Sequence, residues 1–212
     1  MNLHSSVRSF ACALFLAAGA SAYAAVLTAV GESAFASDPN LTYDDGALFD
    51  PVDGQTIGGV VHGFTVGGST SADALIDFLP GVTDRITPFN IEGTSSGALS
   101  LTFGTAQTRI GFNWLLQGSG GTVQLFDSSG ALLGSTDFSG TTDSVTGGQT
   151  GFAGVESDTA FTRALVSWSG DGRFAFDDLR FGGGGAPVPV PGTLALLAVG
   201  AALMGAARRR RT

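Results

Sequence analysis

The 212-residue sequence predicts an all-β protein with a single β-sandwich domain. Three observations lead to this fold class. The chain contains 33 glycines, which argues against long helices because glycine destabilises a helix interior. Short runs of alternating apolar and polar residues recur through the middle of the chain, and this period of two is typical of half-buried strands. Turn residues separate the runs at short intervals, as expected for a sandwich.

The individual strands follow from that alternation. Ile110, Phe112 and Trp114 are spaced two apart, so they share one face of a strand. The turn sequence Asp127-Ser128-Ser129-Gly130 between two such runs predicts a hairpin, with Val123 and Leu125 opposite Leu132 and its neighbours. The predicted strands are 58–66, 99–103, 108–116, 122–126, 131–137, 152–155, 163–168 and 173–181, with loops at 37–55 and 141–150.

The last predicted strand is Arg173–Phe181, in which Phe174 and Phe176 alternate as core residues. Leu179 and Phe181 continue the apolar face only if the alternation slips by one residue at the pair Asp177-Asp178 that precedes them. The sequence therefore predicts an irregularity at that point of the strand.

The first 24 residues predict a cleaved secretory signal peptide. Arg8 precedes an apolar run at 10–18, which is shorter than the roughly 20 residues needed to span a bilayer. The run ends at Ala22-Tyr23-Ala24, the small-residue pattern that signal peptidase cleaves. Cleavage after Ala24 removes Cys12, the one cysteine of the chain. We therefore expect no disulfide, thiolate metal site or cysteine nucleophile in the mature protein.

The charges are concentrated in the middle of the chain. All 18 acidic residues lie between Glu32 and Asp178, and the segment from Glu32 to Arg180 contains only five arginines and no lysine, which gives it a net charge of −13. Such a surface repels nucleic acid and anionic membranes. We therefore expect a soluble extracellular domain that has no nucleic-acid partner.

The C-terminal region has three elements in order. The four glycines at 182–185 and the alternating prolines Pro187, Pro189 and Pro191 predict a flexible, extended linker. An uncharged stretch follows, 20 residues long when counted from Val188, which is just enough for a helix to cross a bilayer. Four arginines follow this stretch, just before the last residue Thr212, and are expected to stay on the cytoplasmic side. An amphipathic core helix is a poor alternative because the stretch has no polar face.

This tripartite tail resembles the PEP-CTERM sorting signal of exported proteins from Gram-negative bacteria, many of which make exopolysaccharide. The resemblance implies that an exosortase, an integral-membrane cysteine protease-transpeptidase, processes the chain near the motif after transient anchoring in the membrane. Val190 stands where the family usually has glutamate, and a permanent single-span anchor is the alternative. The motif residues are Val188, Pro189, Val190, Pro191 and Gly192, and the basic stop is Arg208, Arg209, Arg210 and Arg211.

The segment 151–182 resembles, more loosely, the β-sandwich ectodomains that often precede this signal, and those look like carbohydrate-binding jelly rolls. The expected organisation is a signal peptide at 1–24, a jelly-roll-like ectodomain at 25–181, a linker with the sorting motif at 182–192, a transmembrane helix at 193–207 and a basic tail at 208–212.

We expect a non-enzymatic cell-surface or extracellular-matrix protein that associates with exopolysaccharide in a biofilm. A lectin-like carbohydrate-binding module is the alternative. Alternation assigns most of the aromatic residues to the core, but Trp168 comes before the polar Ser169-Gly170-Asp171, and we expect it to be exposed as a ligand-binding residue. A secreted glycan hydrolase would need two carboxyl groups about 5–10 Å apart across a cleft. His62, the one histidine after the leader, lies in a predicted strand and is expected to be a packed or surface residue and not a catalytic base.

A structural calcium ion is a further hypothesis, since Ca²⁺ is bound by six to eight oxygen ligands. In a jelly roll the first and last strands can lie side by side, which would bring acidic residues from both ends together. A solvated charged turn is the alternative. Adjacent aspartates on a strand point to opposite faces, so one of the last pair is expected to face inward or to bind Arg173 or Arg180. The candidate ligands are Asp177, Asp178, Asp44, Asp45 and Glu32.

Overall fold

The computed structural model describes residues 24–79 and 85–183. The predicted signal peptide up to residue 23, the sorting motif, the helix at 193–207 and the basic tail lie outside the described residues. No helix within the described ranges has the length and apolar character needed to cross a membrane.

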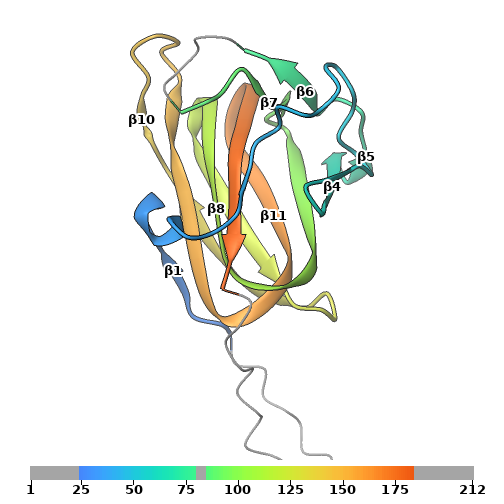
Figure 1. Cartoon of the computed structure of the whole chain (residues 1–212). Coiled ribbons are helices and arrows are strands. Elements are labelled where there is room, and N and C mark those ends of the chain that lie inside the picture. Colours follow the sequence, from blue (N-terminus) through green and yellow to red (C-terminus); the bar gives the residue numbers. More distant parts are fainter. Residues whose placement is uncertain (1–23, 80–84, 184–212) are drawn as a thin grey trace, which may run out of the picture.

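The described chain is almost entirely strand (Figure 1), which confirms the predicted β-sandwich. The elements are β1 (Leu27–Ala29), the 3₁₀ helix η1 (Glu32–Phe35), β2 (Asn40–Leu41), β3 (Thr56–Ile57), β4 (Val60–Val66), β5 (Ser69–Thr70), β6 (Leu75–Phe78), β7 (Phe89–Thr94), β8 (Gly97–Phe126), β9 (Leu132–Phe138), β10 (Thr141–Thr142) and β11 (Gln149–Gly182).

Two long strands, β8 and β11, organise the sandwich. Residues 109–116 of β8 pair on one side with 149–156 of β11 and on the other side with 174–182 of the same strand. Further along, 120–126 of β8 pairs with 163–169 of β11. The main path of the sheet is β3-β4-β8-β11-β7-β6, with β1, β2 and β10 added to β11, β5 added to β4 and β9 added to β8.

Aromatic side chains fill the core of the sandwich. Trp114 and Phe112 are fully buried, as the alternation predicts. Phe112 packs on Phe176 at 4.7 Å between ring centroids. Trp168 stacks on Phe174 at 4.3 Å with an angle of 15° between the ring planes. Each buried aromatic residue removes a large apolar area from water, so these contacts dominate the stability of the core.

The predicted strands are confirmed, although several of them belong to one continuous element. The runs 99–103, 108–116 and 122–126 all lie in β8, and 152–155, 163–168 and 173–181 all lie in β11. The hairpin is also confirmed, with Leu132 opposite Phe126 and Val123 opposite Thr136. The alternation did not predict β6 and β7. β6 has only four residues, and β7 carries a buried asparagine and a glycine among its apolar residues.

Glycines make the corners at which the long strands change direction. Gly120 has a φ of 130°, and a Cβ at this position would lie 2.0 Å from the carbonyl oxygen of Phe138. Gly170, which faces the same corner from β11, has a φ of 147°. The pairing between β8 and β11 shifts register between Ser169 and Gly170. The bend therefore requires residues without a side chain.

We expect Gly120→Ala to lower the free energy of unfolding by about 3 kcal/mol, because the new Cβ combines an unfavourable φ with a backbone clash. Gly104→Ala is the matched control in the same strand: its Cβ would meet nothing within 4 Å. The control should leave stability unchanged or raise it by up to ~1 kcal/mol. Urea unfolding of both variants measures the difference, and equal losses would contradict the role of Gly120.

Candidate functional site

A cleft lies on the outer face of the layer formed by β6, β7, β8 and β11, on the side turned away from the core. Directly opposite residues in antiparallel strands share a face. Glu92 of β7 lies opposite Ala175 of β11, which in turn lies opposite Leu115 of β8. These three residues form a row across the outer face, with Ala175 and Leu115 in the base of the cleft and Glu92 at its rim.

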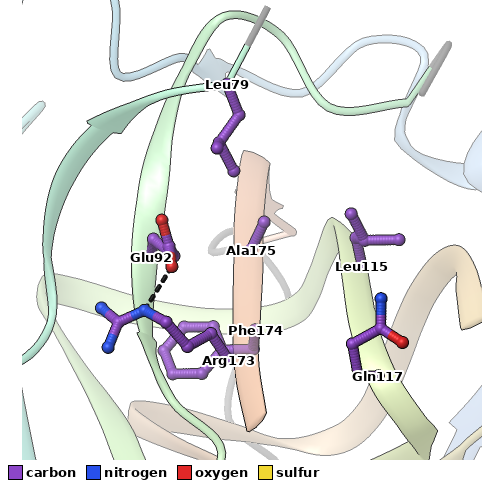
Figure 2. Close-up of a pocket in the computed structure, with 7 residues that line it drawn as sticks. All are labelled: Leu79, Glu92, Leu115, Gln117, Arg173, Phe174 and Ala175. Atoms are coloured by element: carbon purple, nitrogen blue, oxygen red, sulfur yellow. Dashed lines mark hydrogen bonds and ion pairs between the residues drawn. The ribbon is translucent and has the colours of Figure 1, made fainter. Parts of the chain in front are cut away.

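The cleft has a volume of about 350 Å³. Figure 2 shows Glu92 and Arg173 on one side of the strand that carries Ala175, and Leu115 and Gln117 on the other. Leu79 packs with Leu115 and Ala175 in a small apolar cluster that is separate from the main core. The lining residues are Leu79, Glu92, Leu115, Gln117, Arg173, Phe174 and Ala175.

The polar rim of the cleft is held by a set of ion pairs. The Nε of Arg173 donates to Oε1 of Glu92, and its Nη1 donates to Oδ1 of Asp73 at 3.1 Å. Nη2 of the same guanidinium donates to the backbone carbonyl of Asp73 at 3.3 Å. Asp73 is itself fixed, because its Oδ2 accepts the backbone N–H of Thr94 at 2.7 Å. These contacts hold Arg173 in one position at the edge of the cleft.

The carboxyl group of Glu92 interacts with that of Asp77 on β6. Burial, followed by this interaction, raises the pKa of Glu92, while the interaction with Glu92 lowers the pKa of Asp77. Because the two carboxyl groups interact, they titrate as a pair. With its apolar base, carboxyl and guanidinium groups and the Gln117 amide, the cleft presents hydrogen-bond donors and acceptors around an apolar floor.

Asp177 and Asp178 both contact groups of the outer face, which differs from the predicted opposite orientation. The predicted irregularity is confirmed: the register shifts between Asp177 and Arg180, and Asp178 has a φ of 51°. This bulge interrupts the alternation on which the predicted orientation rested. Asp177 is fully buried and accepts from the backbone N–H and the hydroxyl of Thr87, both at 2.6 Å.

Asp178 accepts from the side-chain amides of Asn40 at 2.9 Å and Asn113 at 2.8 Å. Of the two alternatives for the paired aspartates, burial of one of them or an ion pair with Arg173 or Arg180, the structure shows the first, since Asp177 is fully buried. The Arg180 guanidinium binds Glu32 of η1 instead, at 2.8 Å. The polar contacts of the bulge are therefore made by amides and hydroxyls.

The four aspartates of the calcium hypothesis do not come together. Asp44 and Asp45 are exposed in a turn that follows β2. Within residues 24–79 and 85–183, no group of three or more histidine, cysteine, aspartate or glutamate side chains is placed to hold a metal ion. Asp177 and Asp178 instead serve to attach the segment around Thr87 and the start of β2 to the last part of β11.

Trp168 is a core residue and not the exposed residue that its polar neighbours suggested. Only 8% of its surface is exposed. Its indole lies between Phe174 and Phe138, with ring centroids 4.3 Å and 5.7 Å away. The polar residues after it belong to the corner at Gly170 and not to an open strand end. Trp168 therefore offers no surface on which a sugar could stack.

His62 is a packed residue, as expected. The Val60 carbonyl can only accept, so Nδ1 of His62 donates to it at 3.0 Å, while the Tyr43 hydroxyl donates to Nε2 over 3.2 Å. Burial lowers the pKa of His62 to about 4, so the ring is neutral at physiological pH. With 1% of its surface exposed, it is closed to a substrate.

Gly93-Thr94-Ser95-Ser96-Gly97 has the spacing of the G-x-S-x-G nucleophile motif. In α/β-hydrolases that motif joins a strand to a helix and exposes the serine. Here it forms the turn between β7 and β8. Ser95 is 4% exposed, and its hydroxyl donates to the Gly170 carbonyl at 2.7 Å. Ser95 therefore stabilises the corner and is not placed as a nucleophile.

The family model of the PEP-CTERM protein-sorting motif matches residues 187–211. The chain carries a PEP-CTERM sorting motif. The interpretation of the tail as a sorting signal is thereby confirmed, including the variant residue Val190. The motif marks an exported protein that is anchored transiently in the membrane, and an exosortase is the kind of partner that it implies.

Solved structures similar to this chain show low sequence identity. The K2 cleaved adhesin domain of Lys-gingipain is 11% identical with a TM-score of 0.41, and the match covers 68% of this chain and 99% of that one. The family 29 carbohydrate-binding module CBM29-2 is 13% identical with a TM-score of 0.37, over 74% of this chain and 91% of that one. A search of curated proteins gives no match.

The enzymatically active domain of tailspike protein 4 from bacteriophage CBA120 is 12% identical to this chain, with a TM-score of 0.40. The match covers 67% of this chain but only 21% of the tailspike domain. The chain thus spans about a fifth of the length of that phage protein.

The buried His62 and Asp177 give the PEP-CTERM ectodomain two opposite pH dependences. The lowered pKa of His62, about 4 against 6.5, means that its contribution to stability is lost as the pH falls from 6.5 to 4. Burial raises the pKa of Asp177 from 3.8 to about 6, so its contribution is lost as the pH rises through that range. Between pH 4 and 6 the two effects oppose each other.

We expect His62→Gln to remove the first effect and expose the second. Relative to the parent protein, the free energy of unfolding of this variant should fall by about 3 kcal/mol as the pH rises from 4 to 6.5. Urea unfolding at four pH values across that range measures the difference. If the two stability curves run parallel, then His62 titrates in the folded protein as it does in the unfolded chain, and the expected linkage is absent.

Proposed function

We propose that this exported domain is a non-enzymatic cell-surface or extracellular-matrix protein that binds a glycan in the outer-face cleft, and that the glycan is an exopolysaccharide of the surrounding biofilm. The observation that carries the proposal is the composition of the cleft. Leu115, Ala175 and Leu79 supply an apolar base, and Glu92, Arg173 and Gln117 supply hydrogen-bonding groups at its rim. A sugar ring has matching surfaces, since its C–H faces are apolar and its edge carries hydroxyl groups.

The position of the cleft supports a role for an anchored or released surface protein. The last strand of the sandwich begins at Arg173, beside the cleft, and ends at Gly182, where the linker starts. Its nine residue steps span about 30 Å. In Figure 1 this strand, drawn in orange to red, runs from the end that carries β6 and β7 to the end where β1 begins. The cleft thus lies at the end of the domain remote from Gly182, the last residue of β11.

The chemistry of the described residues supports binding without turnover. A glycosidase needs two carboxyl groups about 5–10 Å apart. Of the described residues that line the cleft, Glu92 is the one with a carboxyl group, and it is held by Arg173. These lining residues therefore do not supply the second carboxyl group that a glycosidase needs. The buried His62 and Ser95 offer no base or nucleophile to this cleft.

Gln117→Ala tests the cleft as the glycan site, because Gln117 is exposed at its rim and has no structural ion pair to lose. We expect glycan affinity to fall by about three- to tenfold, the effect of one or two lost hydrogen bonds. Gln124→Ala is the matched control, since Gln124 lies further along β8, beyond the corner. Isothermal titration calorimetry against neutral and acidic oligosaccharides measures both variants.

Equal affinity of the two variants would place the binding surface elsewhere on the domain. Release of reducing sugar from the same oligosaccharides by the parent protein would contradict the non-enzymatic part of the proposal and would favour the hydrolase.

The sorting motif gives a second expected outcome, on the protein recovered from the cell envelope. Its intact mass should lack the basic stop Arg208–Arg211, because the implied exosortase processes the chain near Val188–Gly192. Recovery with the four arginines attached would show a permanent anchor. Replacing Pro189 and Pro191 by alanine should leave the tail uncut and so serves as the control.

A further inference from the structure

We propose that the cleft accepts uncharged glycans and excludes those that carry carboxylate groups, with Asp73 as the residue that determines this specificity. The inference rests on the proposed glycan-binding function. It names the chemical class of the ligand, which neither the sorting motif nor the fold specifies.

Arg173 already donates hydrogen bonds to acidic residues of the domain. Among the described residues that line the cleft, it is the one cation. An arginine recognises a carboxylate by donating two parallel hydrogen bonds from one edge of its planar guanidinium. Here Nη1 and Nη2 both donate to Asp73, and Nε donates to Glu92. A uronic acid would have to displace one of these acidic partners to bind Arg173.

Asp73 is held beside Arg173 by hydrogen bonds to both of its carboxylate oxygens. Its Oδ1 accepts from Arg173 while its Oδ2 accepts the backbone N–H of Thr94 at 2.7 Å. Thr94 lies directly opposite Arg173 in the pairing of β7 with β11. The carboxylate therefore bridges two adjacent strands through both of its oxygens, and moving it would leave a backbone donor without its partner.

Acidic groups outnumber basic groups around the cleft. Three carboxyl groups, those of Asp73, Asp77 and Glu92, surround the single guanidinium of Arg173. A carboxylate ligand would meet repulsion that a hydroxyl group does not. The net charge of −13 between Glu32 and Arg180 adds to this repulsion at longer range. Hydroxyl groups can still bind the free lone pairs of Glu92, the remaining N–H groups of Arg173 and the amide of Gln117.

The experiment compares matched pairs of probes on the full ectodomain. Neutral β-1,4-linked tetrasaccharides of glucose, mannose and galactose are each paired with the same tetrasaccharide oxidised at C6 to the carboxylate. We expect at least one neutral tetrasaccharide to bind, and its oxidised form to bind at least tenfold more weakly. Asp73→Asn should reduce the ratio of the two affinities, neutral form over oxidised form, by about tenfold. Asp158→Asn, which removes the same charge at an exposed position on β11 next to β1, should leave that ratio unchanged.

The outcomes separate the two proposals. If an oxidised tetrasaccharide binds as well as or better than its neutral form, the glycan site stands but the inferred specificity is wrong. If Asp73→Asn and Asp158→Asn have the same effect, the specificity does not arise from Asp73. If no neutral or oxidised tetrasaccharide binds the parent domain, the proposed glycan function fails and the inference fails with it. Thermal unfolding of each variant confirms that the compared proteins are folded.

Discussion

The pairing of residues 109–116 of β8 with two separate segments of β11 is the constraint on which the rest of the structure depends. Because this one segment has neighbours on both sides, it fixes the position of 149–156 and 174–182 at once. The core aromatics Phe112 and Trp114 project from one of its faces, and Asn113, Leu115 and Gln117 lie on the other. The same eight residues therefore define both the interior of the sandwich and the floor of the cleft. Such a central strand gains stability from cross-strand pairs on two sides.

The cleft is a product of long-range pairing. Its residues come from β7, β8, β11 and the segment after β6, so they are separated by up to about a hundred positions in the chain. The ion pairs of Arg173 with Asp73 and Glu92 connect the same elements. Since both carboxylates and the guanidinium are partly exposed, these pairs add little to stability on their own. In the proposed specificity, these pairs set the charge of the cleft. They also engage the N–H groups of Arg173 that an anionic ligand would otherwise bind.

Alternation in the sequence was sufficient to predict the sandwich, the Asp127–Gly130 hairpin and the irregularity at Asp177 and Asp178. It could not predict the direction of the two aspartates, because the bulge itself removes the rule that adjacent residues face opposite sides. Trp168 was misplaced for a similar reason: polar residues after a strand indicate an exposed end, but here they form a corner inside the fold. Glu92, Gln117 and Arg173 are unremarkable polar positions in their own strands. Only the register, which no single run of sequence contains, brings them together.

The sorting motif bears on where the protein goes, and the cleft bears on what it binds there. The motif is a local feature of sequence, so its residues were identified directly and the family model confirms them. The most direct test of the central claim is a methyl NMR titration of the ectodomain, labelled at leucine and alanine, with the neutral tetrasaccharide that binds it. We expect the largest chemical-shift changes at Leu79, Leu115 and Ala175, the methyl-bearing residues of the cleft. Shifts centred instead on Leu48, beside the exposed Phe49, with the cleft methyls unchanged would contradict it.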